Sequence, residues 1–457
     1  MSVASKEELV GLAGQMVEAA KKAGADIAEA YSHQSSHLST KTRLKAPELV
    51  EEAGSKGVGL RVMLGKQVAL VHTSDLSKAG LKRTVEDAIE LAKLAQEDPF
   101  AGPPDASLLS KSDQHVNLDL FDESMQKLST AEAIERASAG EKAAFDYDSR
   151  ITNSEGGTFG RIAGASAIVT SGGFQGYSKG TYASLVVSPV ADETDGKKRT
   201  GYYWSAKRHL AELKDAKTVG EEAARRTLAK LGAQKVATQH APVVFDPDAA
   251  RSILSLLASC INGSAIWRKS SYLAEKEGER IASELVNVID DPLIPRAPGS
   301  RPFDGEGLAS RRNTIVENGV LRSYLLDSYS ARKLGKESTA NASRGASGGV
   351  SPSSSNFILK PGSQSAEELL ASTPKGLYVT DMMGFGFNAI TGDFSRGASG
   401  FWIENGEKTF PVSEVTISLN IDELLKSIDA IANDLELDTS IAAPTFRVRS
   451  MTIAGRD

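Results

Sequence analysis

Residues 58–72 carry the pattern that most constrains the fold of this chain. Val58, Leu60, Val62 and Leu64 alternate with other residues, and after Gly65-Lys66 the alternation resumes at Val68, Leu70 and His72. Successive side chains of a strand point to opposite faces, so this spacing predicts two antiparallel strands joined by a tight turn. Helical patterns on either side of the hairpin predict an α+β fold class with flanking helices.

The first 104 residues are expected to form an N-terminal α+β domain. Ser5 and Glu8 make a capping box, a helix start signal, and further apolar residues follow at helical spacing. These residues are Leu9, Leu12, Met16 and Ala20. A second amphipathic helix carries Leu81, Val85, Ala88, Ile89 and Ala92. The Pro/Gly-rich segment 97–104 then predicts a linker.

Two further domains are expected. Residues 105–235 show another capping box (Ser129 to Glu132), strands over 151–190 and a helix over 221–231, which predict a middle α+β domain. Residues 236–457 show a helix over 249–261 and then short strands, which predict a β-rich C-terminal domain. The Ser/Gly-rich stretch 336–355 is expected to be a mobile polar loop.

Composition limits the cellular location of the protein and the classes of partner it is expected to bind. The net charge is −6, and the densest basic clusters, 197–199 and 225–226, lie among acidic residues and are interpreted as solvated faces. A nucleic-acid partner is therefore not expected, because such binding usually needs a basic stripe. A single cysteine, no apolar leader and no long apolar run predict a cytoplasmic protein without a membrane segment.

The histidines do not predict a metal site. Of the six, only His33 and His37 are close in sequence, and residues 31–42 have a strand-like pattern. On a strand the two rings would share one face about 13 Å apart at a rise of ~3.3 Å per residue. Zinc binds nitrogen at ~2 Å, so one ion cannot join them. Surface polar residues are the preferred interpretation.

Nucleophile motifs match by letters only, and no catalytic residue is assigned. Gly345-Ala346-Ser347-Gly348-Gly349 fits G-x-S-x-G, but it lacks the strand before, the helix after and a downstream histidine. Ser330 to Lys333 fits S-x-x-K, which a solvated helix end explains equally well. Cys260 lies on the apolar helix without a neighbouring His or Lys and is expected to be buried and unreactive.

Residues 384–402 form the most unusual stretch. Gly384-Phe385-Gly386-Phe387-Asn388-Ala389 resembles a dinucleotide fingerprint, but no helix follows it, so nucleotide binding is not expected. Glycines alternating with Met, Phe and Trp suit a strand-edge groove for an extended peptide, and a tightly packed sheet core remains the equal alternative. The groove candidates are Gly384, Phe385, Gly386, Asp393, Ser395 and Arg396.

The same region resembles the PmbA (TldE) branch of the TldD/PmbA family. Residues 376–384, 390–406 and 411–417 match the family pattern, and supporting segments lie at 150–157, 268–270, 303–307 (Phe-Asp-Gly-Glu-Gly) and 328–335. The resemblance implies three domains and dimers that enclose a central cavity. It also implies a TldD-type partner, a zinc metallopeptidase with H-E-x-x-x-H on a helix and a third-ligand cysteine. Peptide maturation and antitoxin degradation are activities associated with the family.

The resemblance also implies that this chain lacks the zinc site. The histidine motif would fall on the 249–261 helix near Ser255, Leu256 and Cys260, and the ligand cysteine would fall in 437–444, which has none. The leading hypothesis is a subunit without bound metal, inactive alone, whose TldD-like partner supplies zinc and cuts small or unfolded peptides. One alternative is a metal-free homodimeric peptide-binding or chaperone-like protein. Another is a hydrolase using Asp393, Ser395 or Glu306.

Overall fold

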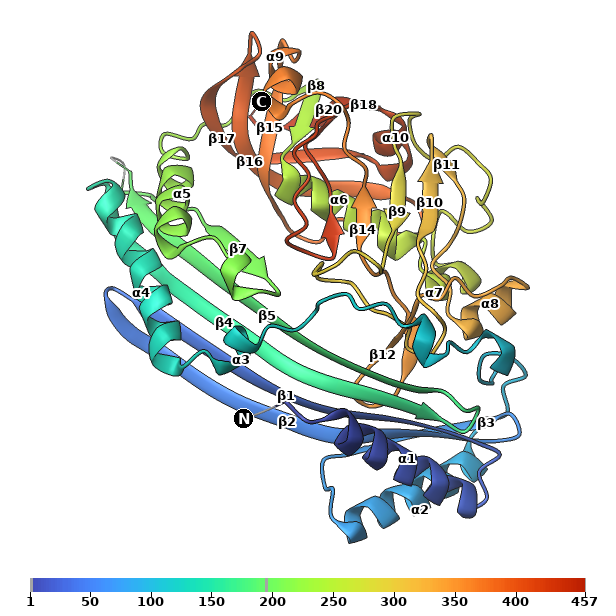
Figure 1. Ribbon diagram of the computed structural model, residues 1–457. Coiled ribbons are helices and arrows are strands. Elements are labelled where there is room, and N and C mark those ends of the chain that lie inside the picture. The colour runs from blue at the N-terminus through green and yellow to red at the C-terminus, as the bar shows by residue number, and fades with distance from the viewer. Residues whose placement is uncertain (1–2, 194–195, 457) are drawn as a thin grey trace.

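One long antiparallel sheet forms the base of the molecule. The computed structural model describes residues 3–193 and 196–456. The sheet order is β3-β2-β1-β4-β5-β6, and β7 also pairs with β5. The strands are β1 (Ile27–Arg43), β2 (Ala46–Leu64), β3 (Gln67–Thr73), β4 (Ile151–Thr170), β5 (Gln175–Asp192), β6 (Lys198–Thr200) and β7 (Tyr203–Lys207). Figure 1 shows the long strands curving beneath the C-terminal part of the chain.

The predicted hairpin is confirmed as β2–β3. Leu64 faces Gln67 across the turn, and Gly65 has a φ of +57°, a conformation that glycine adopts without steric penalty. The sheet continues beyond it, because β1 pairs with β4 along most of its length. Strands from residues 27–73 and 151–207 therefore share one hydrogen-bonded sheet. The proposed division of the chain at residues 104 and 235 stays a prediction.

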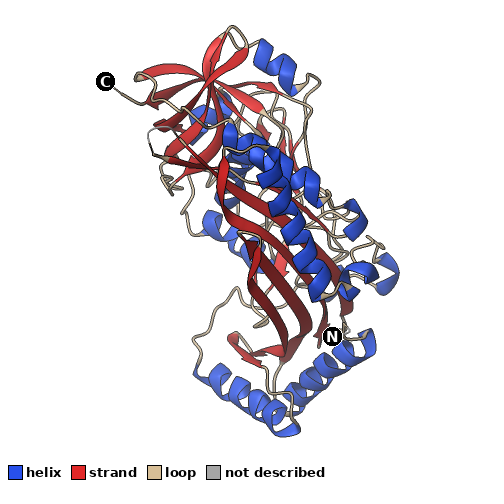
Figure 2. Ribbon diagram, turned by 90° about the vertical axis from the view of Figure 1, so that its left-hand side faces the viewer, coloured by secondary structure: helices blue, strands red, loops and turns tan. Residues whose placement is uncertain are grey.

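Two helix pairs cover this sheet. Helices α1 (Lys6–Lys22) and α2 (Lys78–Leu94) bury an apolar cluster against β1–β3, and both views place them at the end remote from the C-terminal strands (Figure 1, Figure 2). Helices α4 (Thr130–Tyr147) and α5 (Ala216–Leu228) pack on β4 and β5. The capping boxes at Ser5 and Ser129 are both present. The short helix α3 spans Glu123–Lys127.

The C-terminal part has its own, larger core. Strands β17-β16-β15-β8-β20 form a closed ring, because β17 also pairs with β20, and β18 extends it. Their bounds are β8 (Gln239–Phe245), β15 (Lys375–Met383), β16 (Asp393–Glu404), β17 (Glu407–Asn420), β18 (Ile428–Ile431) and β20 (Phe446–Ala454). Helix α6 (Pro247–Cys260) buries its apolar face in this core. The expected α+β fold is confirmed.

Smaller elements complete this part. A five-stranded sheet contains β9 (Val288–Asp290), β10 (Asn313–Glu317), β11 (Val320–Leu321), β14 (Phe357–Leu359) and β19 (Ile441–Ala442). The short helices are α7 (Gly263–Trp267), α8 (Ser328–Leu334), α9 (Ala366–Ala371) and α10 (Ile421–Lys426). Among the described residues, no helix combines the length and hydrophobicity needed to cross a membrane.

The polar stretch 336–355 differs from the expected loop. It contains a hairpin of β12 (Ala342–Arg344) and β13 (Val350–Pro352), and the G-x-S-x-G letters fall in its turn. The Arg344 guanidinium lies 2.7 Å from the Glu29 carboxylate on β1, which ties the hairpin to the long sheet. The buried ion pair is one of several polar contacts that hold this segment, another being the Asn341 amide on the Asp290 carboxylate.

The predicted linker and the S-x-x-K segment hold each other in place. Arg332 on α8 donates hydrogen bonds to the carbonyls of Phe100, Gly102 and Pro103 at 2.7–3.1 Å. Ser330 is fully buried, so the interpretation of this helix end as solvated is wrong for that residue. The residues of the S-x-x-K match thus fix the linker against the C-terminal part.

Candidate functional site

The groove candidates from the sequence divide between a turn and a strand. Gly384, Phe385 and Gly386 lie in the turn after β15, whereas the other three lie on β16. The Phe385 side chain is 98% exposed, and Met383 and Ile390 beside it are also exposed. A large exposed aromatic residue flanked by apolar neighbours is typical of a contact surface.

Only part of this region is a free strand edge. β16 lies between β15 and β17, so its backbone hydrogen bonds are taken and it offers no edge to a peptide. β15 pairs with β16 on one side, but on the other β8 covers only Leu377–Val379. Within the described chain, residues 380–383 therefore have no strand partner on that side. The strand edge open to a peptide is therefore 380–383, whereas 393–404 is paired on both sides.

Two of the three candidates on β16, Asp393 and Ser395, hold the turn. The Ser395 amide donates to the Gly386 carbonyl at 2.9 Å, and the Asn388 amide donates to the Asp393 carbonyl at 2.9 Å. The Asp393 carboxylate accepts from the Thr391 hydroxyl at 2.6 Å. Neither Asp393 nor any histidine among the described residues is hydrogen-bonded to the Ser395 hydroxyl, so nothing there activates it as a nucleophile.

A cavity of about 350 Å³ opens beside the free edge of β15. Tyr378, Thr380 and Asp381 of β15 form one wall, and Lys230, which lies 3.0 Å from the Asp381 carboxylate, forms part of another. The remaining lining residues are Tyr202, Arg225, Arg226, Ala229, Asp246, Asp248, Phe401, Lys408, Thr409 and Pro411. Arg225 lines this cavity but is solvent-exposed and pairs with Glu222, as expected for a solvated face, whereas Arg226 is partly buried.

Asp246 is the buried carboxylate of this region. It is the N-cap of α6, where its Oδ1 accepts the Ala249 amide at 2.9 Å, and it is 7% exposed. Burial raises the pKa of Asp246 to about 7. The nearby Arg226 pairs with Glu222 at 2.8 Å rather than with Asp246. A carboxyl group that titrates near neutrality therefore faces the cavity.

A second cavity, of about 270 Å³, lies on the other side of Asp246. It is walled by the first turn of α6 with Asp248 and Arg251, and by the segment 434–443. The helix and the segment to which the family resemblance assigns zinc ligands are therefore neighbours in space. Trp204 and Tyr203 of β7 close the cavity from the side of the long sheet.

The residues at those positions do not fit a zinc site. The Ser255 hydroxyl donates to the Arg251 carbonyl at 2.9 Å, and Leu256 packs against the core. Cys260 is 1% exposed, and burial raises the pKa of its thiol to about 11. In the segment 437–444, Asp438 pairs with Lys207. Zinc needs His nitrogen, thiolate or carboxylate ligands converging within ~2.3 Å. No such group of three or more occurs among the described residues.

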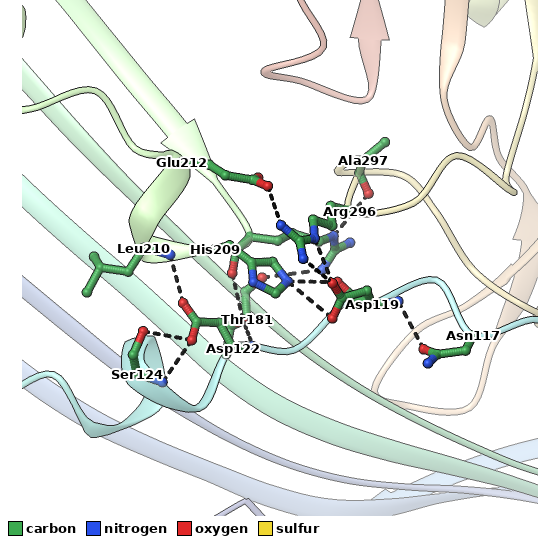
Figure 3. Close-up of polar contacts among 11 residues, drawn as sticks. Asn117, Asp119, Asp122, Ser124, Thr181, His209, Leu210, Glu212, Arg296 and Ala297 are labelled. Carbon is green, nitrogen blue, oxygen red and sulfur yellow. Dashed lines mark hydrogen bonds and ion pairs between the residues drawn. The ribbon is translucent and has the colours of Figure 1, made fainter.

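The histidines have other partners. His33 and His72 stack with ring centroids 6.0 Å apart on β1 and β3, so the strand assignment around His33 is confirmed. Figure 3 shows His209 beside Asp119, whose carbonyl lies 2.9 Å from the His209 Nε2. Arg296 bridges the Asp119 and Glu212 carboxylates at 2.5 and 2.6 Å. This network fastens the connecting segment before α3 to the C-terminal part.

Sequence reasoning did not single out Asp246, although one signal was present. Asp246-Pro247 before an apolar helix is a helix start, with Asp as N-cap and Pro at the first helical position. That signal places the carboxylate at a helix terminus. Its surroundings include β15, which is distant in the sequence.

Comparison with known proteins identifies the family. Residues 28–92 match the PmbA/TldA metallopeptidase domain 1, residues 123–231 match the central domain, and residues 238–455 match the C-terminal domain. The metalloprotease PmbA of Escherichia coli O157:H7 is 36% identical over 98% of this chain and 96% of its own length. The chain belongs to the PmbA branch of the PmbA/TldD metallopeptidase family.

Solved structures agree with this assignment. A protein from Bacteroides thetaiotaomicron, described as a putative modulator of DNA gyrase, superposes with a TM-score of 0.91 at 30% identity. The match covers 98% of this chain and 99% of that one. TldE from Thermococcus kodakarensis has the same fold, with a TM-score of 0.87 at 22% identity over 97% of this chain and 100% of its own.

Proposed function

We propose that this chain is the subunit without bound metal of a TldD/TldE-type zinc metallopeptidase that cleaves small or unfolded peptides. The observation that carries the proposal is the chemistry of α6 and the segment 434–443. The first turn of α6 and this segment line one cavity. Farther along α6, Ser255, Leu256 and the buried Cys260 stand where the family resemblance places ligands and base. Zinc and the activated water would then come from a TldD-like partner subunit.

The role left to this chain is to bind peptide. The free edge at residues 380–383 can accept an extended peptide through main-chain hydrogen bonds. The adjoining cavity provides Tyr378 and Phe401 for apolar side chains and several charged groups for polar ones. Phe385, at the end of that edge, is placed to contact either the peptide or the partner.

The test compares the chain alone, the chain with a TldD-type protein from the same genome, and that protein alone. Zinc content and cleavage of an unfolded peptide are measured for each. We expect the isolated chain to contain no stoichiometric zinc and to cleave nothing, and the pair to cleave. Zinc bound stoichiometrically to the isolated chain would contradict the proposal. A peptide N-methylated at alternate residues tests edge pairing, because it cannot form the ladder.

The alternative is a metal-free homodimeric peptide-binding or chaperone-like protein. The exposed apolar residues Met383, Phe385 and Ile390 favour a protein contact there, which a second copy of the chain satisfies as well as a TldD-like subunit. Sedimentation of the chain with and without the TldD-type protein separates the two. A stable homodimer that does not exchange with that protein would favour the alternative.

A further inference from the structure

A further cavity, of about 290 Å³, lies on the face of the long sheet that is turned toward the C-terminal part, and we call it the sheet cavity. Strands β1, β4 and β5 form its floor, and its walls include Leu120, Ser300 and Ala346, which come from segments far apart in the sequence. It shares no lining residue with the two cavities around Asp246. Its volume is close to the lower end of the range of about 300–1,000 Å³ typical of small-ligand pockets.

Small residues leave the floor of the sheet cavity almost bare. Ser35, Gly164 and Gly180 lie side by side across the three strands. A Cβ atom at Gly180 would lie only 3.0 Å from the Nη1 atom of Arg208. Glycine at this position therefore allows the Arg208 guanidinium to lie directly on the floor.

The Arg208 guanidinium forms no ion pair with a carboxylate of the described residues. Its Nε, Nη1 and Nη2 atoms donate to the carbonyls of Ala297, Thr181 and Pro298 at 3.0, 3.4 and 2.5 Å. A guanidinium carries more N–H donors than these carbonyls accept, and it stays charged at neutral pH. Burial lowers the pKa of Arg208, the direction expected when a cation leaves water without an anion beside it.

The charge of the sheet cavity is positive. Arg208 and Lys179 line it, and none of its described lining residues is an Asp or a Glu. Lys179 is exposed, and its ammonium lies over the Phe121 ring at 4.2 Å. Asp119 and Asp122, which flank Leu120 in the sequence, are held by other groups, as Figure 3 shows. No side chain of the lining therefore offsets the charge of Arg208.

Hydrogen-bonding groups without partners lie beside the cation. Ser166 and Ser178 face each other across β4 and β5, two residues along the strands from Gly164 and Gly180. Two residues of a strand span about 6.6 Å at a rise of ~3.3 Å per residue. Within the described chain neither hydroxyl forms a hydrogen bond, and the buried Nδ1 of His33, opposite Ser166, has no partner either. A buried polar atom without a partner is destabilising unless a ligand or water meets it.

We propose that the sheet cavity binds a carboxylate group, with the Arg208 guanidinium as its cation and Ser166, Ser178 and His33 as hydrogen-bonding neighbours of the bound residue. The group would come from a peptide C-terminus or from an aspartate or glutamate side chain. The inference goes beyond the proposed function and needs neither zinc nor a partner subunit. It can therefore fail while the peptidase proposal stands, and the reverse also holds.

The test is calorimetric titration of the full chain at low salt with four probes. Nα-acetyl-glycine carries only a terminal carboxylate, and Nα-acetyl-glutamate α-amide carries only a side-chain carboxylate. Nα-acetyl-glutamine amide is the neutral match, and inorganic phosphate represents other oxyanions. We expect at least one carboxylate probe to saturate and the glutamine probe not to. The affinity should fall as sodium chloride is added, because salt screens the attraction between the charges. Saturation by phosphate but by neither carboxylate would contradict the assignment.

Variants connect the binding to this cavity. Arg208→Gln removes the charge and should weaken carboxylate binding at least about tenfold, because charge-assisted hydrogen bonds are lost. Arg332→Gln is the matched control, since Arg332 also donates to three carbonyls but does not line the sheet cavity. If Arg208→Gln misfolds, the double variant Ser166→Ala/Ser178→Ala removes two unpaired hydroxyls and should still weaken binding several-fold. Unchanged affinity in the cavity variants, equal binding of the glutamine probe, or no saturable binding of any carboxylate would overturn the proposal.

Discussion

Arg344 and Glu29 form a buried ion pair across 315 residues of sequence, with their side chains 2.7 Å apart and each 1% exposed. Arg344 also donates to the carbonyls of Gly305 and Gly348, and Glu29 also binds Arg61. Burial alone would raise the pKa of Glu29, but the charges of Arg344 and Arg61 outweigh it and lower that pKa. The pair joins β1 to the β12–β13 hairpin.

We predict that Arg344→Ala lowers the free energy of unfolding by about 3–5 kcal/mol, because it leaves the Glu29 carboxylate buried with only one cation. Urea denaturation followed by circular dichroism measures the change. Lys269→Ala is the matched control, since Lys269 and Glu275 are 75% and 78% exposed and such pairs contribute at most about 1 kcal/mol. An effect of Arg344→Ala no larger than that of the control would show that the pair contributes little.

The sequence predicted the elements whose pattern is local. The β2–β3 hairpin and the capping boxes at Ser5 and Ser129 followed from residues within a few positions of one another. The pairing of β1 with β4, such as Ser36 opposite Ala163, joins segments more than a hundred residues apart. Neither strand carries a local signal for its neighbour, so the single sheet across both segments was not foreseen.

The candidate site was predictable only in part. The glycines and aromatic residues of 384–402 drew attention to this region in the sequence. In the structure its turn exposes Phe385, which agrees with a contact surface. The free edge is confined to 380–383 because β8 stops pairing at Val379, which depends on another strand. Asp246 and Glu306 owe their burial to helices and loops brought together by the fold. Single-sequence patterns contain no measure of such burial.

Cys260 should be unreactive in the folded protein. The thiolate is the reactive form, and burial raises the pKa of this thiol to about 11 while shielding it from solvent. We expect negligible reaction with a thiol-specific disulfide reagent at pH 8 in native buffer and complete reaction in denaturant. Fast labelling under native conditions would mean that α6 opens readily, and would reopen the question of whether this thiol can bind a metal.

Phe385→Ala should weaken binding without changing the stability of the fold. The side chain is 98% exposed, so its removal should change the free energy of unfolding by no more than about 0.5 kcal/mol. If the turn contacts a partner or a peptide, the same change should weaken that association at least several-fold, as is common for a central aromatic residue of an interface. Thermal denaturation and binding titrations of one preparation test both. Leu94→Ala, at an 83% exposed apolar residue far from the turn, is the control.

The raised pKa of Asp246 predicts how the stability of the folded protein depends on pH. Burial raises the pKa of Asp246 from its ordinary value of 3.8 to about 7, so the folded state favours the protonated form. Its contribution to stability is complete below about pH 4 and is lost as pH rises through 7. Asp246→Asn retains the cap but removes the ionisation. As the pH rises from 5 to 8, the free energy of unfolding of the variant should therefore increase relative to that of wild type, by up to about 3 kcal/mol.

Asp215 is the comparison, because its contribution to stability changes with pH in the opposite direction. Asp215 caps α5 by accepting the Thr218 amide at 2.9 Å, and hydrogen bonds from Thr218 lower its pKa. Asp215 contributes to the free energy of unfolding above its pKa in the unfolded chain, near 4. This contribution is lost as the pH falls through its lower pKa in the folded state. Asp215→Asn should thus not share the relative gain of Asp246→Asn between pH 5 and 8. Melting temperatures of both variants and wild type, measured across that pH range, test this difference. Parallel profiles for wild type and Asp246→Asn would mean that the Asp246 carboxylate is hydrated through its cavities and ionises normally.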